Sequence, residues 1–114
     1  KSLAHPASVD SIPTSAGQED HVSMGNASGL KAWQVLANAE RAVAIELLAG
    51  AQAVEFLAPL SAGRGTEEAR RFVRSLSARV VEDRPLSADI ETVASAIRDR
   101  SLAVAVEAEI GALK

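Results

Sequence analysis

The fold is decided by the stretch Asn26–Ala58, NASGLKAWQVLANAERAVAIELLAGAQAVEFLA, which contains no proline and is rich in alanine. Alanine loses no side-chain entropy in a helix, so we predict one continuous helix of about 33 residues, roughly 50 Å long at 1.5 Å per residue. From Ala42 onward this helix is apolar on nearly every side, and such a helix must be buried. A compact chain of this size is only roughly 35 Å across. The helix therefore needs larger surroundings, either more chain or more subunits.

The composition supports an all-α fold in one soluble globular unit. The 114 residues are 47% hydrophobic, 24% charged and 3% aromatic, which leaves little material for strands. The absence of cysteine excludes disulfides, thiolate metal sites and a cysteine nucleophile. The net charge of −3 argues against a nucleic-acid partner. No apolar stretch approaches the roughly 20 residues that cross a membrane. The start Lys1–Pro6, which has no initiator methionine or secretory signal, suggests a piece of a longer protein, and the absence of cysteine fits a cytoplasmic location.

We predict three regions around the long helix. Two prolines in residues 1–14 indicate an irregular, extended segment. In residues 15–58, Ser15 and Gln18 form a capping-box pattern that predicts a helix start, with a kink near residues 25–29 before the long buried helix. Residues 59–114 form a C-terminal helical region. Its apolar spacing predicts three shorter amphipathic helices, at about residues 66–80, 87–99 and 101–113.

Most groups of reactive side chains have a structural explanation. Two histidines, His5 and His21, are too few for a histidine metal centre, so we predict no metal. A triad of Ser11, Asp10 and His5 lacks a strained nucleophile turn. A stripe of arginines is expected to be a solvated helix face neutralised by nearby acids. The arginines are Arg64, Arg70, Arg71, Arg74 and Arg79, and the acids are Glu67, Glu68, Glu82 and Asp83.

The segment Gln18–His21 allows two interpretations. Glu19 and Asp20 could stabilise the first turn of a helix through its dipole. They could also place a carboxylate at the edge of a buried site, where desolvation alters its chemistry. Spacing alone does not decide between these interpretations.

A resemblance favours the second interpretation. The stretches His5–Ser15 (HPASVDSIPTS) and Gly17–Gly25 (GQEDHVSMG) resemble the C-terminal region of histidine ammonia-lyases, which are aromatic amino acid lyases. Weaker similarity continues at Ala44–Ala49 and Ala51–Gln52, and again at Asp83–Leu86 with Asp89–Ile90. The resemblance implies part of a larger, mainly helical subunit of a cytoplasmic homotetramer. That enzyme would eliminate ammonia from L-histidine without a redox step, giving trans-urocanate at the entry to histidine catabolism.

The resemblance also implies a prosthetic group and a site. The family's electrophile is 4-methylideneimidazol-5-one, formed from an Ala-Ser-Gly tripeptide in a buried upstream loop. We interpret Ala27–Gly29 as a chance occurrence of that tripeptide in a helix, so the group would form upstream of this chain. Glu19 matches the family's active-site glutamate, which binds substrate and assists proton transfer, and Gln18 is a second substrate contact. The catalytic tyrosines lie upstream, and this chain has no tyrosine, so we expect it to be inactive alone.

Two alternatives stay open. Related phenylalanine and tyrosine lyases and aminomutases generally have Asn-Gln-Asp where this chain has Gln18–Asp20, and a carboxylate at the middle position suits imidazole better than phenyl. Another lyase or aminomutase of the family is therefore the second choice. The third is a non-catalytic helical oligomerisation module in which Gln18–His21 only stabilise a helix end.

Overall fold

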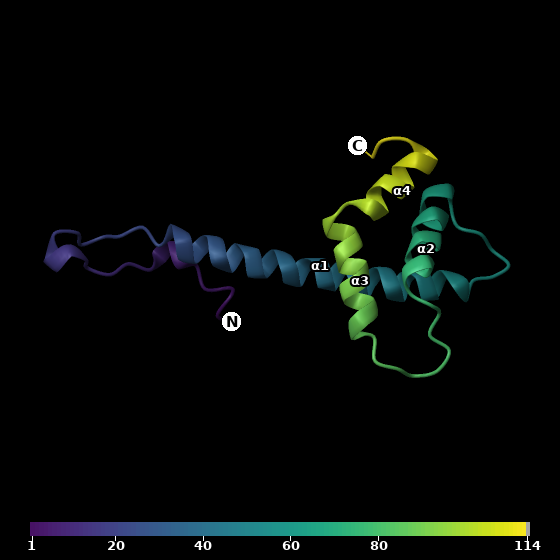
Figure 1. Ribbon diagram of the computed structural model, residues 1–114, viewed down its shortest axis with the longest axis horizontal. Helices are drawn as coiled ribbons and strands as arrows, with labels where there is room; N and C mark the ends of the chain where they lie inside the picture. The colour runs from purple at the N-terminus through teal and green to yellow at the C-terminus, as the bar shows by residue number, and fades with distance from the viewer. Residues whose placement is uncertain (114) are drawn as a thin grey trace. The chain divides into compact units, whose positions relative to one another are not determined.

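The computed structural model describes residues 1–113, and most of them lie in α-helices (Figure 1). Among the described residues there is no strand, only an isolated bridge between Thr14 and Glu19. This confirms the all-α fold class, with a long helix followed by three shorter ones. The helices are α1 (Gly25–Glu55), α2 (Arg64–Leu76), α3 (Ser87–Arg98) and α4 (Ser101–Ile110), preceded by two 3-10 turns at Ala7–Val9 and Ser15–Gly17.

Helix α1 is continuous, as predicted from Asn26 onward, but it begins later than the capping-box pattern indicates. The predicted kink near residues 25–29 was wrong, because these residues form the start of one uninterrupted helix. Its first turn forms where the amide of Ser28 donates to the carbonyl of Met24 at 3.0 Å. The prediction that a helix starts at Ser15 was wrong, because Ser15 opens a short turn with positive φ angles. The helix ends at Glu55, after which two amides bond three residues back and Pro59 follows.

The shorter helices end before their predicted limits. Ser77, directly after α2, is extended, at φ −142° and ψ 122°, and its hydroxyl donates to Asp89. Beyond it, the side-chain amide of Gln52 on α1 donates to the carbonyl of Val80 at 2.7 Å and accepts from its amide at 3.1 Å. These bonds keep residues 77–80 in a non-helical conformation, so these residues do not continue α2. Helix α4 ends at Ile110 because Gly111 adopts φ +86°, which favours glycine.

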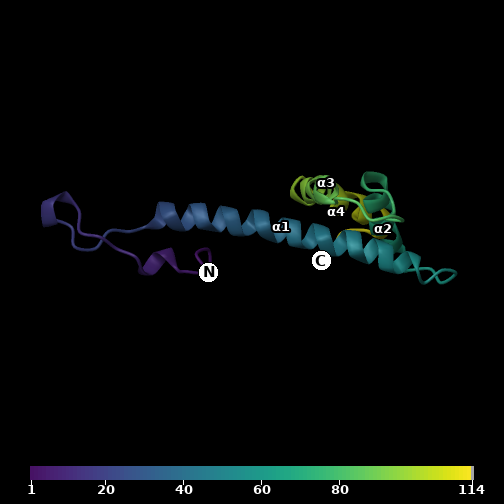
Figure 2. The same ribbon diagram turned by 90° about the horizontal axis from the view of Figure 1, so that it is seen from below.

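The described chain divides into two compact units, one of residues 1–39 and one that begins at Glu40, and α1 runs through both. In the second unit, α2, α3 and α4 pack together beside the C-terminal part of α1 (Figures 1 and 2). The core contains Ala44 and Ala51 of α1, Val73 of α2, and Val93 and Ala94 of α3, all nearly inaccessible to solvent. Small side chains at these positions let the helices approach closely.

Charged pairs connect the same helices from the side. Glu40 and Arg98 are 2.6 Å apart, and Arg41 and Glu91 are also 2.6 Å apart, so two pairs join α1 to α3. All four side chains belong to the second unit. Because exposed ion pairs contribute about 0–1 kcal/mol each, the apolar core remains the main source of stability.

Large apolar side chains of α1 are solvent-exposed in this chain. Trp33 is 75% exposed and Leu30 is 62% exposed, whereas Ala44 and Ala51 are the buried residues of the helix. Burial of the remaining helix by other parts of a larger protein stays a prediction. None of the described helices combines the length and the apolar character needed to cross a membrane.

Truncation of a core valine should destabilise the second unit. We expect Val73→Ala to lower the free energy of unfolding by about 2 kcal/mol, because it removes buried methyl groups and leaves a cavity. Val81→Ala is the matched control, since Val81 is 85% exposed, and should change stability by less than about 0.5 kcal/mol. Urea unfolding followed by circular dichroism measures both. Equal effects would contradict this assignment of the core.

Stability should also depend on pH through Asp89. Hydrogen bonds from Arg84 and then from Ser77 hold the pKa of Asp89 well below its usual value. As pH falls, the unfolded chain, with an aspartate pKa of about 3.9, takes up the proton first. The contribution of Asp89 is therefore complete above about pH 5 and is lost as pH falls through the folded pKa. We expect Asp89→Asn to lower stability at pH 7 and to flatten its acid dependence, whereas Asp83→Asn, in the loop before α3, should retain the original pH profile.

Candidate functional site

The predicted site residues lie on a closed loop of residues 11–22. Its base is fastened by Ser11, whose hydroxyl accepts from the amide of Val22 at 2.8 Å and donates to the carbonyl of Val22 at 3.4 Å. Both residues are partly buried. A short hydroxyl side chain thus takes the place of a strand pairing and brings the two arms of the loop together.

A second closure lies three residues further along each arm. The amide of Thr14 donates to the carbonyl of Glu19 at 2.9 Å, and the amide of Glu19 donates back to the carbonyl of Thr14 at 3.3 Å. The Thr14 hydroxyl also donates to Oε2 of the Glu19 carboxylate at 3.0 Å. Glu19 is therefore fixed to Thr14 by its backbone and by its side chain.

The chain between these two residues turns through the left-handed region. Ser15, Ala16 and Gly17 have φ values of 53°, 54° and 83°. Glycine adopts this conformation freely, but residues with a Cβ do so at a cost of roughly 1–2 kcal/mol each. The small side chains of Ser15 and Ala16 limit this strain, and the hydrogen bonds between Thr14 and Glu19 hold the turn.

The structure brings Glu19 together with Thr14 and leaves its neighbours open to solvent. Gln18, Glu19, Asp20 and His21 are all exposed in this chain. They follow the turn and precede α1, so they do not lie in the first turn of a helix. The helix-dipole interpretation of the two carboxylates was therefore wrong. Sequence reasoning missed Thr14, although a hydroxyl residue directly before a run of small residues was the available signal.

The other histidine-containing candidate does not form a catalytic group. His5 Nε2 is 3.1 Å from Asp10 Oδ1, and the carbonyl of His5 accepts from Nζ of Lys31 at 2.7 Å. The Ser11 hydroxyl bonds to the backbone of Val22 instead. The pair His5–Asp10 and the contact with Lys31 hold residues 5–10 against the start of α1.

The arginine stripe is less solvated than predicted. Arg70 and Arg71 pair with Glu67 and Glu68, as expected. Arg74, however, is only 14% exposed and lies 2.7 Å from Glu55 of α1. Hydrogen bonds from Arg74, and secondarily from Arg70, lower the pKa of Glu55 although partial burial opposes them. The stripe therefore includes a connection between α1 and α2, which is a structural role.

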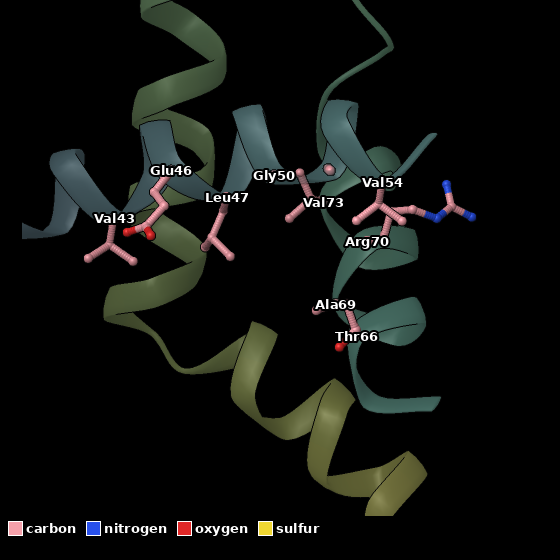
Figure 3. A pocket seen from close by; sticks show the side chains of 10 residues that line it. Val43, Glu46, Leu47, Gly50, Val54, Thr66, Ala69, Arg70 and Val73 are labelled. Carbon is pink, nitrogen blue, oxygen red and sulfur yellow. The ribbon is translucent and has the colours of Figure 1, made fainter. Parts of the chain in front are cut away.

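An apolar cavity of about 300 Å³ in the second unit has no comparable chemistry. Aliphatic side chains of α1 and α2, including Val43, Leu47 and Val54, form most of its wall (Figure 3). Its charged lining residues are Glu46 and Arg70, and Arg70 is already paired. Among residues 1–113, no three histidine, aspartate or glutamate side chains gather in a way that could hold a metal ion.

The tripeptide Ala27–Gly29 does not fit a prosthetic group formed by backbone cyclisation. It lies within α1, and the amide of Ser28 is engaged in a helical bond to Met24. In a regular helix the amide of Gly29 cannot approach the carbonyl carbon of Ala27. The residues described here therefore do not supply such a group.

Comparison with known proteins defines the class. Residues 1–75 match the family model described as aromatic amino acid lyase, and the chain belongs to that family. It is 51% identical over 114 residues to the histidine ammonia-lyase of Natranaerobius thermophilus, and 51% identical over 114 residues to that of Symbiobacterium thermophilum. In both comparisons it spans 22% of the relative's length. The crystal structure of histidine ammonia-lyase from Trypanosoma cruzi matches 95% of this chain and 21% of its own, with 44% identity and a TM-score of 0.86.

Two glycine substitutions should test the turn before Glu19. In the described residues, nothing lies within 4 Å of a Cβ built on Gly17 or Gly29, so a new methyl group meets no neighbour at either position. The two positions differ in backbone conformation, because Gly17 has a positive φ and Gly29 is helical. Gly17→Ala should weaken the loop by about 1–2 kcal/mol because of its positive φ. Gly29→Ala, in α1, should stabilise the helix by about 0.5–1 kcal/mol. Hydrogen-exchange mass spectrometry of peptides 11–22 and 25–39 measures both effects, and faster exchange of peptide 11–22 in Gly29→Ala would contradict the assignment.

Proposed function

We propose that this chain is part of a histidine ammonia-lyase and contributes Glu19 to its active site. The reaction breaks the bond between the α-carbon and the amino nitrogen of L-histidine and removes a proton from the β-carbon. A carbon–carbon double bond forms, giving trans-urocanate and ammonia without oxidation or reduction. The observation that supports this most is the held carboxylate of Glu19, in a chain about half identical to histidine ammonia-lyases.

The chemistry of the substrate favours histidine over phenylalanine. An imidazole has a ring N–H that can donate a hydrogen bond to a carboxylate. Such charge-assisted hydrogen bonds are roughly twice as strong as neutral ones. A phenyl ring offers no such donor and would leave the carboxylate unpaired. Glu19 therefore serves to bind the polar groups of the substrate and assist proton transfer, with Gln18 beside it as a second contact.

The rest of the enzyme lies outside the residues described here. The 4-methylideneimidazol-5-one group would form from an Ala-Ser-Gly tripeptide elsewhere in the full-length protein. The partners of this chain are the remainder of its own subunit and the other subunits of a cytoplasmic homotetramer. The exposed apolar side chains of α1, such as Trp33 and Leu36, suit burial in such an assembly.

The test replaces Glu19 in the full-length protein that carries this sequence. We expect Glu19→Gln to lower turnover of L-histidine by about a hundredfold or more, because the amide has nearly the same shape but lacks the charge and the basicity. Urocanate absorbance measures the rate, and size-exclusion chromatography should show an unchanged assembly. Glu82→Gln makes the same replacement at an exposed loop position and should leave turnover unchanged.

Other results would select the alternatives. If the unmodified protein forms cinnamate or coumarate from aromatic amino acids but no urocanate, it is another lyase of the family. If Glu19→Gln changes only stability, the non-catalytic helical oligomerisation module is favoured and the proposed role of Glu19 is wrong.

A further inference from the structure

The Thr14 hydroxyl makes a contact that the closure of the loop does not require. The backbone bonds between Thr14 and Glu19 already close the turn, and the amide of Gly17 adds a third bond to the carbonyl of Thr14 at 3.1 Å. The hydroxyl goes further and reaches the carboxylate itself, at 3.0 Å from Oε2. It therefore determines how the end of the Glu19 side chain is oriented.

The backbone geometry explains why the two side chains meet. Thr14 is extended, at φ −131° and ψ 173°, and forms an antiparallel bridge with Glu19. Residues directly opposite each other in such a bridge project their side chains to the same face, about 5 Å apart at Cβ. A short β-branched hydroxyl residue fits this distance, and threonine has few rotamers to lose.

The contact leaves one carboxylate oxygen for a ligand. Among residues 1–113, Oε1 of Glu19 accepts no hydrogen bond, whereas Oε2 is engaged by Thr14. A free glutamate side chain samples many rotamers, and ordering it when it binds costs conformational entropy. A carboxylate that is already held at one oxygen presents the other in a defined direction, and this reduces the cost of ordering at the moment of binding.

The strained turn is consistent with such a role. Ser15 and Ala16 adopt positive φ angles between the two bridge residues. Strain of this kind persists only where the surroundings over-determine it, and it is concentrated at functional sites. The consequence of the turn here is to bring a hydroxyl at one end against a carboxylate at the other.

We propose that Thr14 is a positioning residue that orients the Glu19 carboxylate for substrate. This inference rests on the proposed function of Glu19 and adds a residue that acts through it. Thr14 does not touch the substrate; it holds Oε2 so that Oε1 is the oxygen that receives the polar hydrogen of the substrate.

The experiment compares three variants of the full-length protein with L-histidine as substrate. Thr14→Val keeps the shape and removes the hydroxyl, and we expect kcat/KM to fall about tenfold to a hundredfold. Thr14→Ser restores the donor and should recover kcat/KM to within about threefold of the unmodified protein. Thr92→Val makes the same exchange at an exposed hydroxyl that bonds a carbonyl of α3 and should change kcat/KM by less than about twofold.

A double-mutant cycle separates positioning from a merely structural effect. In a Glu19→Ala background the hydroxyl has no carboxylate to hold, so adding Thr14→Val should lower the residual kcat/KM by no more than about twofold. An equal loss with and without Glu19 would show that Thr14 supports only the loop, and would overturn the proposal. Failure of Thr14→Ser to restore activity would also overturn it. If Thr14→Val does not fold, Thr14→Ala removes the same hydroxyl and completes the cycle.

The same measurements separate a failure of the proposed function of Glu19 from a failure of the positioning role of Thr14. If Glu19→Ala alone retains full activity, the proposed function of Glu19 is wrong and the positioning role is overturned with it. If Glu19→Ala loses activity while Thr14→Val retains it, the proposed function stands and only the role of Thr14 is wrong.

Discussion

The unbroken hydrogen-bond ladder of α1, from Gly25 to Glu55, is the constraint on which both compact units depend. In the second unit, small side chains at Ala44 and Ala51 let α2 and α3 pack closely against the helix. In the first unit, Lys31 near its start holds the backbone of His5. A break in this helix would disturb the contacts that it makes in each unit. The absence of proline from this stretch is therefore as important to the fold as its apolar residues.

Polar contacts fix the alignment of α1 with its neighbours more narrowly than the apolar core does. Alanine and valine in the core specify contact but little about register, because their side chains are small and similar in shape. The amide of Gln52 on the backbone of Val80, and the pair formed by Glu55 and Arg74, each require one alignment of α1 with its neighbours. Breaking such a partly buried pair leaves an uncompensated charge. A shifted alignment of α1 would leave these polar groups without their partners and is therefore disfavoured.

The sequence predicted the helices, which depend on neighbouring residues. It missed the turn and the ion pair, which depend on contacts between residues further apart in the chain. The long helix and the apolar spacing of the shorter ones are local properties, and the structure has helices in those regions. The capping-box pattern at Ser15 failed because other bonds close a turn there: the amide of Gln18 donates to the carbonyl of Ser15, and Thr14 and Glu19 exchange two backbone bonds. The pairing of Arg74 with Glu55 joins residues 19 positions apart, and no spacing rule within one helix can find it. Glu19 itself was singled out by resemblance, since spacing left two interpretations open.

The loop of residues 11–22 and helix α1 require different residue types, although they follow one another closely in the sequence. Residues 15–17 need small side chains, because their φ angles are positive, and the proposed role of Glu19 requires polar groups in the residues that follow. From Gly25 onward the chain needs strong helix formers. A site on a loop tolerates backbone strain only when hydrogen bonds fix it, and here Ser11 fastens the base while Thr14 fastens the turn. Because Glu19 belongs to that turn and not to a helix, its carboxylate is oriented by a single neighbouring hydroxyl, and the accuracy of the site depends on that contact.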